Sequence, residues 1–264
     1  MPCDKRQASD FDLGRCLPAQ KQLQQMPTEP IRAFRTKERT FRFPRAFFII
    51  IAVTAHGVSA QEKILFADPF VDKLADGWSW VREDPKGWRL DRKTLVVRTS
   101  RGGLWGTDNN GGNIALRTPP EVKEGKLAVE VLVEIEPTNM YENAGLIWYY
   151  DDDNYIILVK EKIDNDMLVH LVSERDAKAG AAFHKNFNAG KNVWFRAEAE
   201  PGKLSGFYRA SSNEEWLKLG QCDLPLRGKP KVGLTTAYAP SDAEHFTRFS
   251  NFRMLQVQMP SGTP

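Results

Sequence analysis

The most informative pattern along the chain is a pair of apolar runs separated by a short polar turn. Residues 144–150 read Ala-Gly-Leu-Ile-Trp-Tyr-Tyr and residues 155–159 read Tyr-Ile-Ile-Leu-Val, with Asp-Asp-Asp-Asn at 151–154 between them. Asp and Asn favour turns because their side chains bond to their own backbone. The pattern therefore predicts a β-hairpin.

A four-residue loop sets the register that we expect for this hairpin. One face then holds the opposed pairs Tyr150 and Tyr155, Trp148 and Ile157, and Leu146 and Val159, whereas the other face holds Tyr149, Ile147, Ile156 and Leu158. Both faces are apolar. A strand pair covered on both sides is typical of a sandwich, and the curved face of such a sandwich is a place for a ligand groove.

Beyond residue 63, apolar positions recur every two residues far more often than every 3.6. The odd positions of 127–135 and of 193–199 are apolar, whereas charged residues, Glu130 among them, occupy several even positions and predict a solvated strand face. Further strands are expected near 63–68, 94–99, 113–117, 167–173, 203–210, 216–222, 232–239 and 246–256. Many short antiparallel strands predict an all-β, two-sheet sandwich or jelly roll of about 200 residues.

The segment before this domain has the three parts of a secretory signal peptide. Residues 32–45 are basic, 46–55 are apolar and 56–60 read His-Gly-Val-Ser-Ala, which predicts cleavage after Ala60. The apolar run is short of the roughly 20 residues that cross a membrane, so an uncleaved anchor is the weaker alternative and no transmembrane segment is expected after cleavage. We therefore divide the chain into three parts. Residues 1–44 are a disordered or artefactual extension that includes the basic region, residues 45–60 are the signal peptide, and residues 61–264 are the domain. Met26 is an alternative start.

Charge and cysteine content change once the leader is set apart. The chain has 37 Lys and Arg against 34 Asp and Glu, but residues 1–60 contain 10 and 5 of these, which leaves 27 and 29 for the domain. The domain is thus slightly acidic, and nucleic acid is not expected as a partner. Cys222 is its single cysteine and follows apolar residues in a predicted strand, so we expect a buried, inert thiol.

A series of short motifs carries a family resemblance over roughly residues 64–256. In order they are Phe66-x-Asp68-x-Phe70, Trp78-x-Trp80, Trp88-x-Leu90, Leu95-x-Val97, residues 144–149, Trp194, Phe207-Tyr208 before Trp216, Val232-Gly233-Leu234 and Phe246-x-x-Phe249. This series resembles a concanavalin A-like domain, and it is most similar to a bacterial secreted family related to the C-terminal module of β-xylosidases. The resemblance implies two curved sheets stacked as a jelly roll, with carbohydrate as the ligand class. The Ser-x-Asp-Gly turn common in such domains is replaced by residues 211–215, so no role of that Asp is carried over.

Catalytic carboxylates are not arranged as in the glucanases of this superfamily, which place Glu, Asp and Glu at alternate positions of one strand. The nearest segment, 130–136, has apolar residues where the additional acid would stand. Retaining hydrolysis needs two carboxyls about 5–5.5 Å apart, and inversion needs a wider pair. Glu142, Glu161 and Asp164 from separate strands are the remaining candidates, which keeps a glycoside hydrolase or polysaccharide lyase open as an alternative.

Metal-binding patterns are weak. His170, His184 and His245 lack ligand spacing, which favours surface or strand histidines. The aspartates at 151–153 lack the Gly and Glu of an EF-hand loop and are better explained as a hairpin turn. The resemblance makes Asp68, near the start of the domain, a candidate for a structural calcium as in many jelly rolls, and no other cofactor is expected.

The best candidate for a ligand site is the glycine- and asparagine-rich segment 101–113. Glycines allow close approach to a ligand, Asn bonds hydroxyls, and an indole offers a flat face to a sugar ring. We select as candidate ligand residues Trp105, Asn109, Asn110, Tyr149, Tyr155 and Trp80. The alternative is a plain connection with Trp105 in the core, where we also expect Trp78, Trp88, Trp148, Trp194 and Trp216.

Together these features favour a secreted or periplasmic, non-catalytic, lectin-like domain. Its expected partner is a polysaccharide or oligosaccharide, and it would act alone or as an accessory to polysaccharide degradation. The alternatives are the hydrolase or lyase above and a structural or protein-interaction domain of the cell envelope, because a fold by itself does not fix function.

Overall fold

A computed structural model describes residues 61–224 and 228–258. The extension and signal peptide expected at 1–44 and 45–60 lie outside the described residues. Fifteen strands make up the fold: β1 (Glu62–Asp68), β2 (Trp78–Val81), β3 (Trp88–Leu90), β4 (Leu95–Arg98), β5 (Ile114–Arg117), β6 (Lys126–Glu134), β7 (Asn143–Asp151), β8 (Asn154–Ile163), β9 (Asp166–Arg175), β10 (Lys178–Asn186), β11 (Asn192–Glu200), β12 (Lys203–Arg209), β13 (Leu217–Asp223), β14 (Lys231–Ala237) and β15 (Phe246–Val257). A 3₁₀ turn at Pro85–Gly87 is the single helical element of the described ranges.

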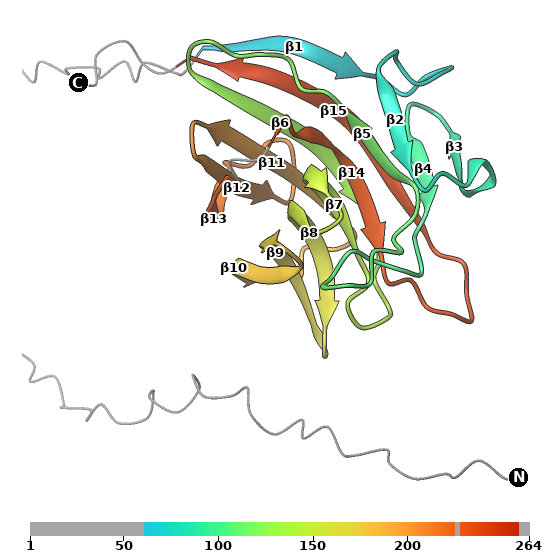
Figure 1. Ribbon diagram of the computed structural model, residues 1–264. Helices are drawn as coiled ribbons and strands as arrows, with labels where there is room; N and C mark the ends of the chain where they lie inside the picture. The colour runs from blue at the N-terminus through green and yellow to red at the C-terminus, as the bar shows by residue number, and fades with distance from the viewer. Residues whose placement is uncertain (1–60, 225–227, 259–264) are drawn as a thin grey trace, which may run out of the picture. The chain divides into compact units, whose positions relative to one another are not determined.

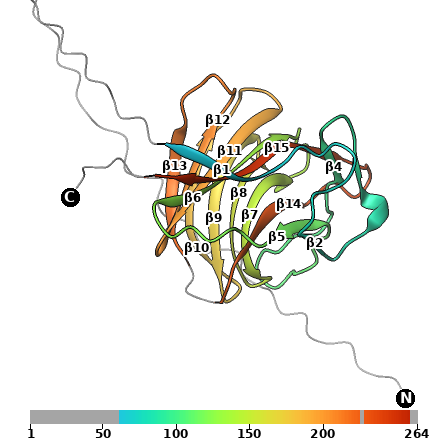
Figure 2. The ribbon, with the colours of Figure 1, turned by 90° about the horizontal axis from the view of Figure 1, so that it is seen from above.

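The strands form two antiparallel sheets that lie in two layers (Figures 1 and 2). One sheet has the order β13-β12-β11-β6-β15-β4-β3, with β1 also paired to β15, and the other has the order β10-β9-β8-β7-β14-β5-β2. Neighbouring strands are often distant in the sequence, as in a jelly roll. The all-β sandwich and most of the predicted strands are confirmed, whereas β2, β3 and β10 were not predicted as strands. Within residues 61–224 and 228–258 there is no helix long and apolar enough to cross a membrane.

The core between the sheets consists of the alternating positions that the sequence predicted. Val129, Val131 and Val133 of β6 belong to one buried cluster together with Phe195 of β11 and Trp148 of β7. Cys222 is buried in the same cluster, and burial raises the pKa of its thiol to about 11. The thiol is therefore protonated at neutral pH, as expected for an inert cysteine.

The predicted register of the β7–β8 hairpin is wrong by one residue. Tyr149, not Tyr150, pairs with Tyr155, and the register shifts between Tyr149 and Asp151. The bulge arises because Asp151 pairs directly with Asn154 and its Oδ1 accepts hydrogen bonds from Asp153 N and Asn154 Nδ2, which shortens the turn to two residues. Leu146, Trp148, Ile156 and Leu158 of the hairpin therefore face the core, while Ile147 and Tyr155 pack in a second cluster on the outer face of the sheet.

The outer face of the other sheet also differs from the expectation. Glu130 of β6 was predicted to be solvated, but it is fully buried because arginines from both neighbouring strands cover it. Arg196 Nη1 of β11 lies 2.5 Å from Glu130 Oε1, and Arg253 Nε of β15 lies 2.6 Å from Oε2. These two ion pairs compensate the free-energy cost of burying the Glu130 carboxylate.

Two tryptophans that we expected in the core lie on that same outer face. Trp194 and Trp216 are partly exposed, and the Arg209 guanidinium lies 5.4 Å from the first ring and 4.1 Å from the second. Both rings form cation–π contacts with Arg209, and such contacts are favourable at a surface that water can reach. Trp78 and Trp88 pack against the main core, as predicted.

Candidate functional site

A groove of about 470 Å³ lies on the outer face of the seven-stranded sheet. Its floor comes from alternate residues of β8 and β9, namely Tyr155, Ile157, Glu161, Ile163, His170 and Val172. The intervening residues of β8, such as Ile156 and Leu158, belong to the core, because neighbouring side chains of a strand point to opposite faces. Alternate side chains of β8 and β9 therefore face the core and the groove.

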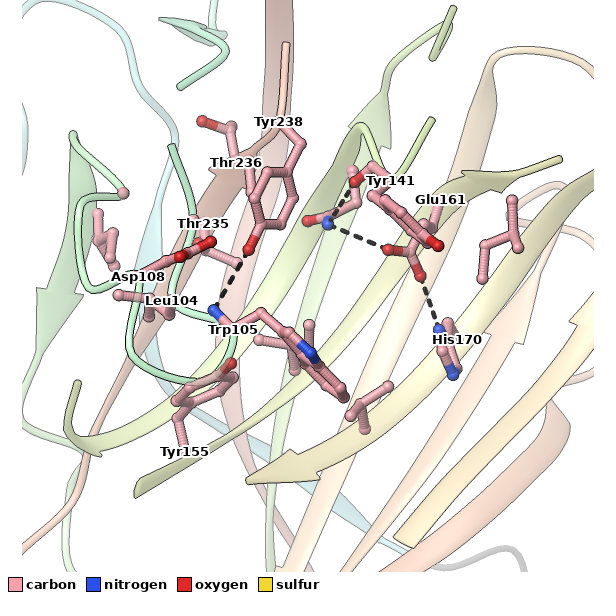
Figure 3. Close-up of a pocket in the computed structure, with 18 residues that line it drawn as sticks. Leu104, Trp105, Asp108, Tyr141, Tyr155, Glu161, His170, Thr235, Thr236 and Tyr238 are labelled. Atoms are coloured by element: carbon pink, nitrogen blue, oxygen red, sulfur yellow. Dashed lines mark hydrogen bonds and ion pairs between the residues drawn. The ribbon is translucent and has the colours of Figure 1, made fainter. Parts of the chain in front are cut away.

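One wall of the groove is the segment from Gly103 to Gly111, which belongs to the connection from β4 to β5 and carries Leu104, Trp105 and Asp108 (Figure 3). Leu104 is buried against Tyr155, whereas the next residue, Trp105, is 49% exposed. In Figure 3 the indole of Trp105 extends between Tyr155 and the pair formed by Glu161 and His170. Leu104 is thus the buried residue of this segment, in the cluster on the outer face of the sheet, and the indole of Trp105 lines the groove.

Four hydrogen bonds to other parts of the fold hold this segment in place. Trp105 N donates to the hydroxyl of Tyr238 at 3.3 Å, and Gly106 N donates to Glu174 Oε2 at 3.1 Å. Asn109 Nδ2 donates to Asp153 Oδ1 at 2.7 Å, and Arg82 Nε donates to the carbonyl of Gly111 at 2.5 Å. The wall that carries Trp105 is therefore fastened at several points.

Glu174 links this wall to the floor of the groove. Its Oε2 accepts from the hydroxyl of Tyr155 as well as from Gly106 N, both at 3.1 Å. The residue is fully buried, and burial raises the pKa of Glu174 and that of Tyr155. Tyr155 therefore uses its hydroxyl within the protein and offers a ligand little surface, because it is only 2% exposed.

The structure brings two of the six candidate ligand residues, Trp105 and Tyr155, to the groove. Asn109 and Asn110 stabilise the wall itself. Asn109 bonds Asp153, and Asn110 Oδ1 accepts a hydrogen bond from Gly103 N at 2.9 Å. The other two lie elsewhere: Tyr149 donates its hydroxyl to Asp152 at 2.8 Å, and Trp80 stacks on Trp88 with ring centroids 5.0 Å apart.

A carboxylate–imidazole pair on the floor was not predicted as a pair. Glu161 Oε2 lies 2.7 Å from His170 Nδ1, and Asn143 Nδ2 donates to Oε1 at 3.4 Å. The signal that could have found it is the strand period, which places Glu161 and His170 on the face of Tyr155 and Ile157 once the β8–β9 register is known. Of the three acids that the sequence left as candidates for a catalytic groove, Glu161 lines this one, whereas Glu142 pairs with His245 at 2.7 Å and Asp164 lies in the β8–β9 turn.

Asp68 has a defined role in the fold. Its Oδ1 accepts from Phe70 N at 2.9 Å, and its Oδ2 accepts from Ala75 N at 2.9 Å and from Trp78 Nε1 at 2.8 Å. These three bonds fix the connection from β1 to β2. In the described part of the chain no group of three or more His, Cys, Asp and Glu is placed to hold a metal ion, and a calcium ion at Asp68 stays a prediction.

The stacked antiparallel sheets and the groove on one outer face define a concanavalin A-like domain. The chain belongs to the family described as the beta xylosidase C-terminal concanavalin A-like domain, which matches residues 67–232. This confirms the resemblance found in the sequence. No curated protein matches the chain.

Several solved structures share the fold at low sequence identity. The GH43 protein BlXynB of Bacillus licheniformis is 20% identical with a TM-score of 0.63, and the match covers 72% of this chain and 39% of that one. A xylan beta-1,4-xylosidase of Bacillus halodurans is 19% identical with a TM-score of 0.60, covering 71% and 38%. A Bacteroides ovatus protein named for a xyloglucan locus, GH43B, is 16% identical with a TM-score of 0.60, covering 73% and 38%. This chain thus matches less than half the length of each of these proteins.

Proposed function

We propose that the chain is an exported, non-catalytic carbohydrate-binding domain that holds a sugar chain in the groove beside Trp105. The observation that carries the proposal is the half-exposed indole of Trp105, on a wall fastened to the sheet, at a groove with a mostly apolar floor. Burying one face of an indole against the C–H groups of a sugar ring is favourable, and a pre-placed anchor costs little ordering entropy on binding.

Polar groups around the groove suit the hydroxyls of the same ligand. Glu161 accepts hydrogen bonds, Asn143 donates and accepts, and the hydroxyls of Tyr141 and Tyr238 do both. Tyr141 is 48% exposed and gives the lining a second exposed aromatic ring. Apolar surface with a few placed polar groups is typical of small-ligand sites.

The related proteins suggest which sugars to test first. Two of them are named for xylan and xyloglucan, and all are longer chains of which this domain matches less than half. We therefore propose an accessory role in the degradation of plant-type polysaccharides, with xylo-oligosaccharides and xyloglucan oligosaccharides as first probes.

The test is a calorimetric titration of the full chain with xylohexaose and with a xyloglucan heptasaccharide. Trp105→Ala should weaken binding by about thirtyfold, which corresponds to about 2 kcal/mol, and leave the melting temperature unchanged. Trp216→Ala is the matched control, because that ring is also partly exposed but lies on the other sheet; it should leave affinity unchanged. Loss of stability with unchanged affinity in Trp105→Ala would contradict the site, and no binding of either sugar would contradict the proposed function.

A hydrolase is the second candidate, because Glu161 and Asp108 are two carboxylates that line one groove. Glycosidases use such a pair when the spacing is right. The same sugars should be incubated with the full chain and with Glu161→Gln, and products should be measured by chromatography. Reducing ends released by the native chain and not by the variant would favour the hydrolase over the binding domain.

A further inference from the structure

The ionisable groups that line the groove leave it without a free positive charge. Asp108 and Glu161 contribute carboxylates, and the fully buried Glu174 lies directly behind the wall, bonded to Gly106. His170 is the single basic side chain of the lining in the described ranges, and its Nδ1 is bonded to Glu161. No lysine or arginine of these ranges lines the groove.

The lysine and arginines that lie near these residues in the structure or in the sequence do not line the groove. Arg82 bonds the carbonyl of Gly111, but its guanidinium pairs with both oxygens of Asp152, at 2.7 and 3.0 Å. Lys162, next to Glu161 in the sequence, is on the opposite face of β8 and donates to the carbonyl of Thr138 at 2.7 Å. Arg101, which begins the wall segment, lines a different cavity together with Arg82 and Arg98.

We propose that the groove selects its glycan by charge: it accepts sugars that carry hydroxyl or amino groups and rejects uronic acids and sulfated sugars. This inference rests on the proposed carbohydrate function and adds the ligand class. A hydroxyl or ammonium group gains a charge-assisted bond to Glu161, whereas a sugar carboxylate would approach two like charges in a partly desolvated site without a cation to neutralise it. Specificity of this kind comes from the repulsion of the wrong ligand.

The experiment compares three β-1,4-linked hexasaccharides that differ in charge. Cellohexaose is neutral, its C6-oxidised form carries carboxylates, and the fully deacetylated chitosan hexamer carries ammonium groups. For the full chain at low ionic strength, we expect the oxidised hexamer to bind at least tenfold more weakly than cellohexaose, and the chitosan hexamer to bind at least as tightly. Added salt should reduce both differences, because it screens charge.

Two isosteric variants and one control locate the effect. Asp108→Asn and Glu161→Gln should each reduce the difference in affinity between neutral and oxidised cellohexaose. Glu215→Gln removes an equal charge from the turn before β13, on the other sheet, and should leave that difference unchanged. Melting temperatures check that each variant is folded.

Three outcomes would overturn the inference. Equal or tighter binding of the oxidised hexamer would refute charge selection while carbohydrate binding stands. An equal effect of all three variants on this affinity difference would show that the charge selection does not arise in the groove. Absence of binding to all three hexamers, together with absence of binding to the xylan and xyloglucan probes, would refute the proposed function and this inference with it.

Discussion

Lys160 and Glu161 are neighbours on β8, yet their side chains serve opposite faces of the sheet. Glu161 lines the groove, whereas Lys160 is on the core face, is 2% exposed and donates from Nζ to the carbonyls of Ile135 at 3.0 Å and Gly190 at 2.6 Å. Burial lowers the pKa of Lys160 from 10.5 to about 8. An ammonium group with two carbonyl partners ties the end of β6 to the connection between β10 and β11.

This lowered pKa predicts a dependence of stability on pH. Between pH 8 and 10.5 the unfolded chain keeps the Lys160 proton that the folded chain has lost, so this group makes the folded state more stable as pH rises. Relative to Lys160→Met, the unfolding free energy of the native chain should rise by about 2–3 kcal/mol across this window and stay level below it. Urea unfolding of both proteins at several pH values measures the difference.

The comparison with Lys160→Met separates this effect from other groups. The raised pKa of Cys222 acts in the opposite direction, because its thiol ionises in the unfolded chain at lower pH than in the fold. That contribution is present in both proteins and cancels. Parallel curves for the two proteins would show that Lys160 keeps an ordinary pKa.

At the level of single elements, β7 and β14 each carry a glycine on the face of the groove. A Cβ at Gly145 would overlap the carbonyl of Leu158, and one at Gly233 would overlap the carbonyl of Ala115. Both neighbours are backbone atoms of paired strands, which cannot move without breaking the ladder. These glycines therefore allow the close pairing of β7 with β8 and of β14 with β5 in the sheet that carries the groove.

Gly145→Ala should destabilise the fold by about 1–3 kcal/mol, as overpacked sites do. Gly112→Ala is the matched control, since its nearest neighbour, the carbonyl of Arg82, would be 3.4 Å from the new Cβ, an ordinary contact. We expect a change below about 0.5 kcal/mol there. Denaturant unfolding of both variants measures the difference, and equal stability would mean that the strands at Gly145 can separate at little cost.

Strand positions could be read from the sequence because alternation is a local property. β6 and β11 have an apolar residue at every second position, and this period identified the residues that face the core. The register of β7 and β8 could not be read in the same way, because it depends on the bonds of Asp151 to two residues of the turn. β10 was missed because its sequence, Lys-Ala-Gly-Ala-Ala-Phe-His-Lys-Asn, lacks alternating large apolar residues.

At the scale of the whole molecule, the two sheets have different outer faces. One carries the buried ion pairs of Glu130, and the other carries the groove. The sequence could select Trp105 as a candidate because an indole in a glycine-rich loop is recognisable locally. It could not place Glu161 beside His170, or Tyr141 and Tyr238 at the same groove, because these contacts depend on β8–β9 pairing and on loops that meet only in the fold.

The order of the segments along the chain leads to the last prediction, which concerns export. The basic, apolar and small-residue parts of the expected signal peptide end at Ala60, and β1 starts two residues later, at Glu62. Because the small residues Val58 and Ala60 meet the needs of signal peptidase, the exported product should begin near Gln61. N-terminal sequencing of the product from outside the cytoplasm tests this. Ala60→Trp should retain the leader by blocking the cut, and a native product that still contains Arg45 would contradict the prediction.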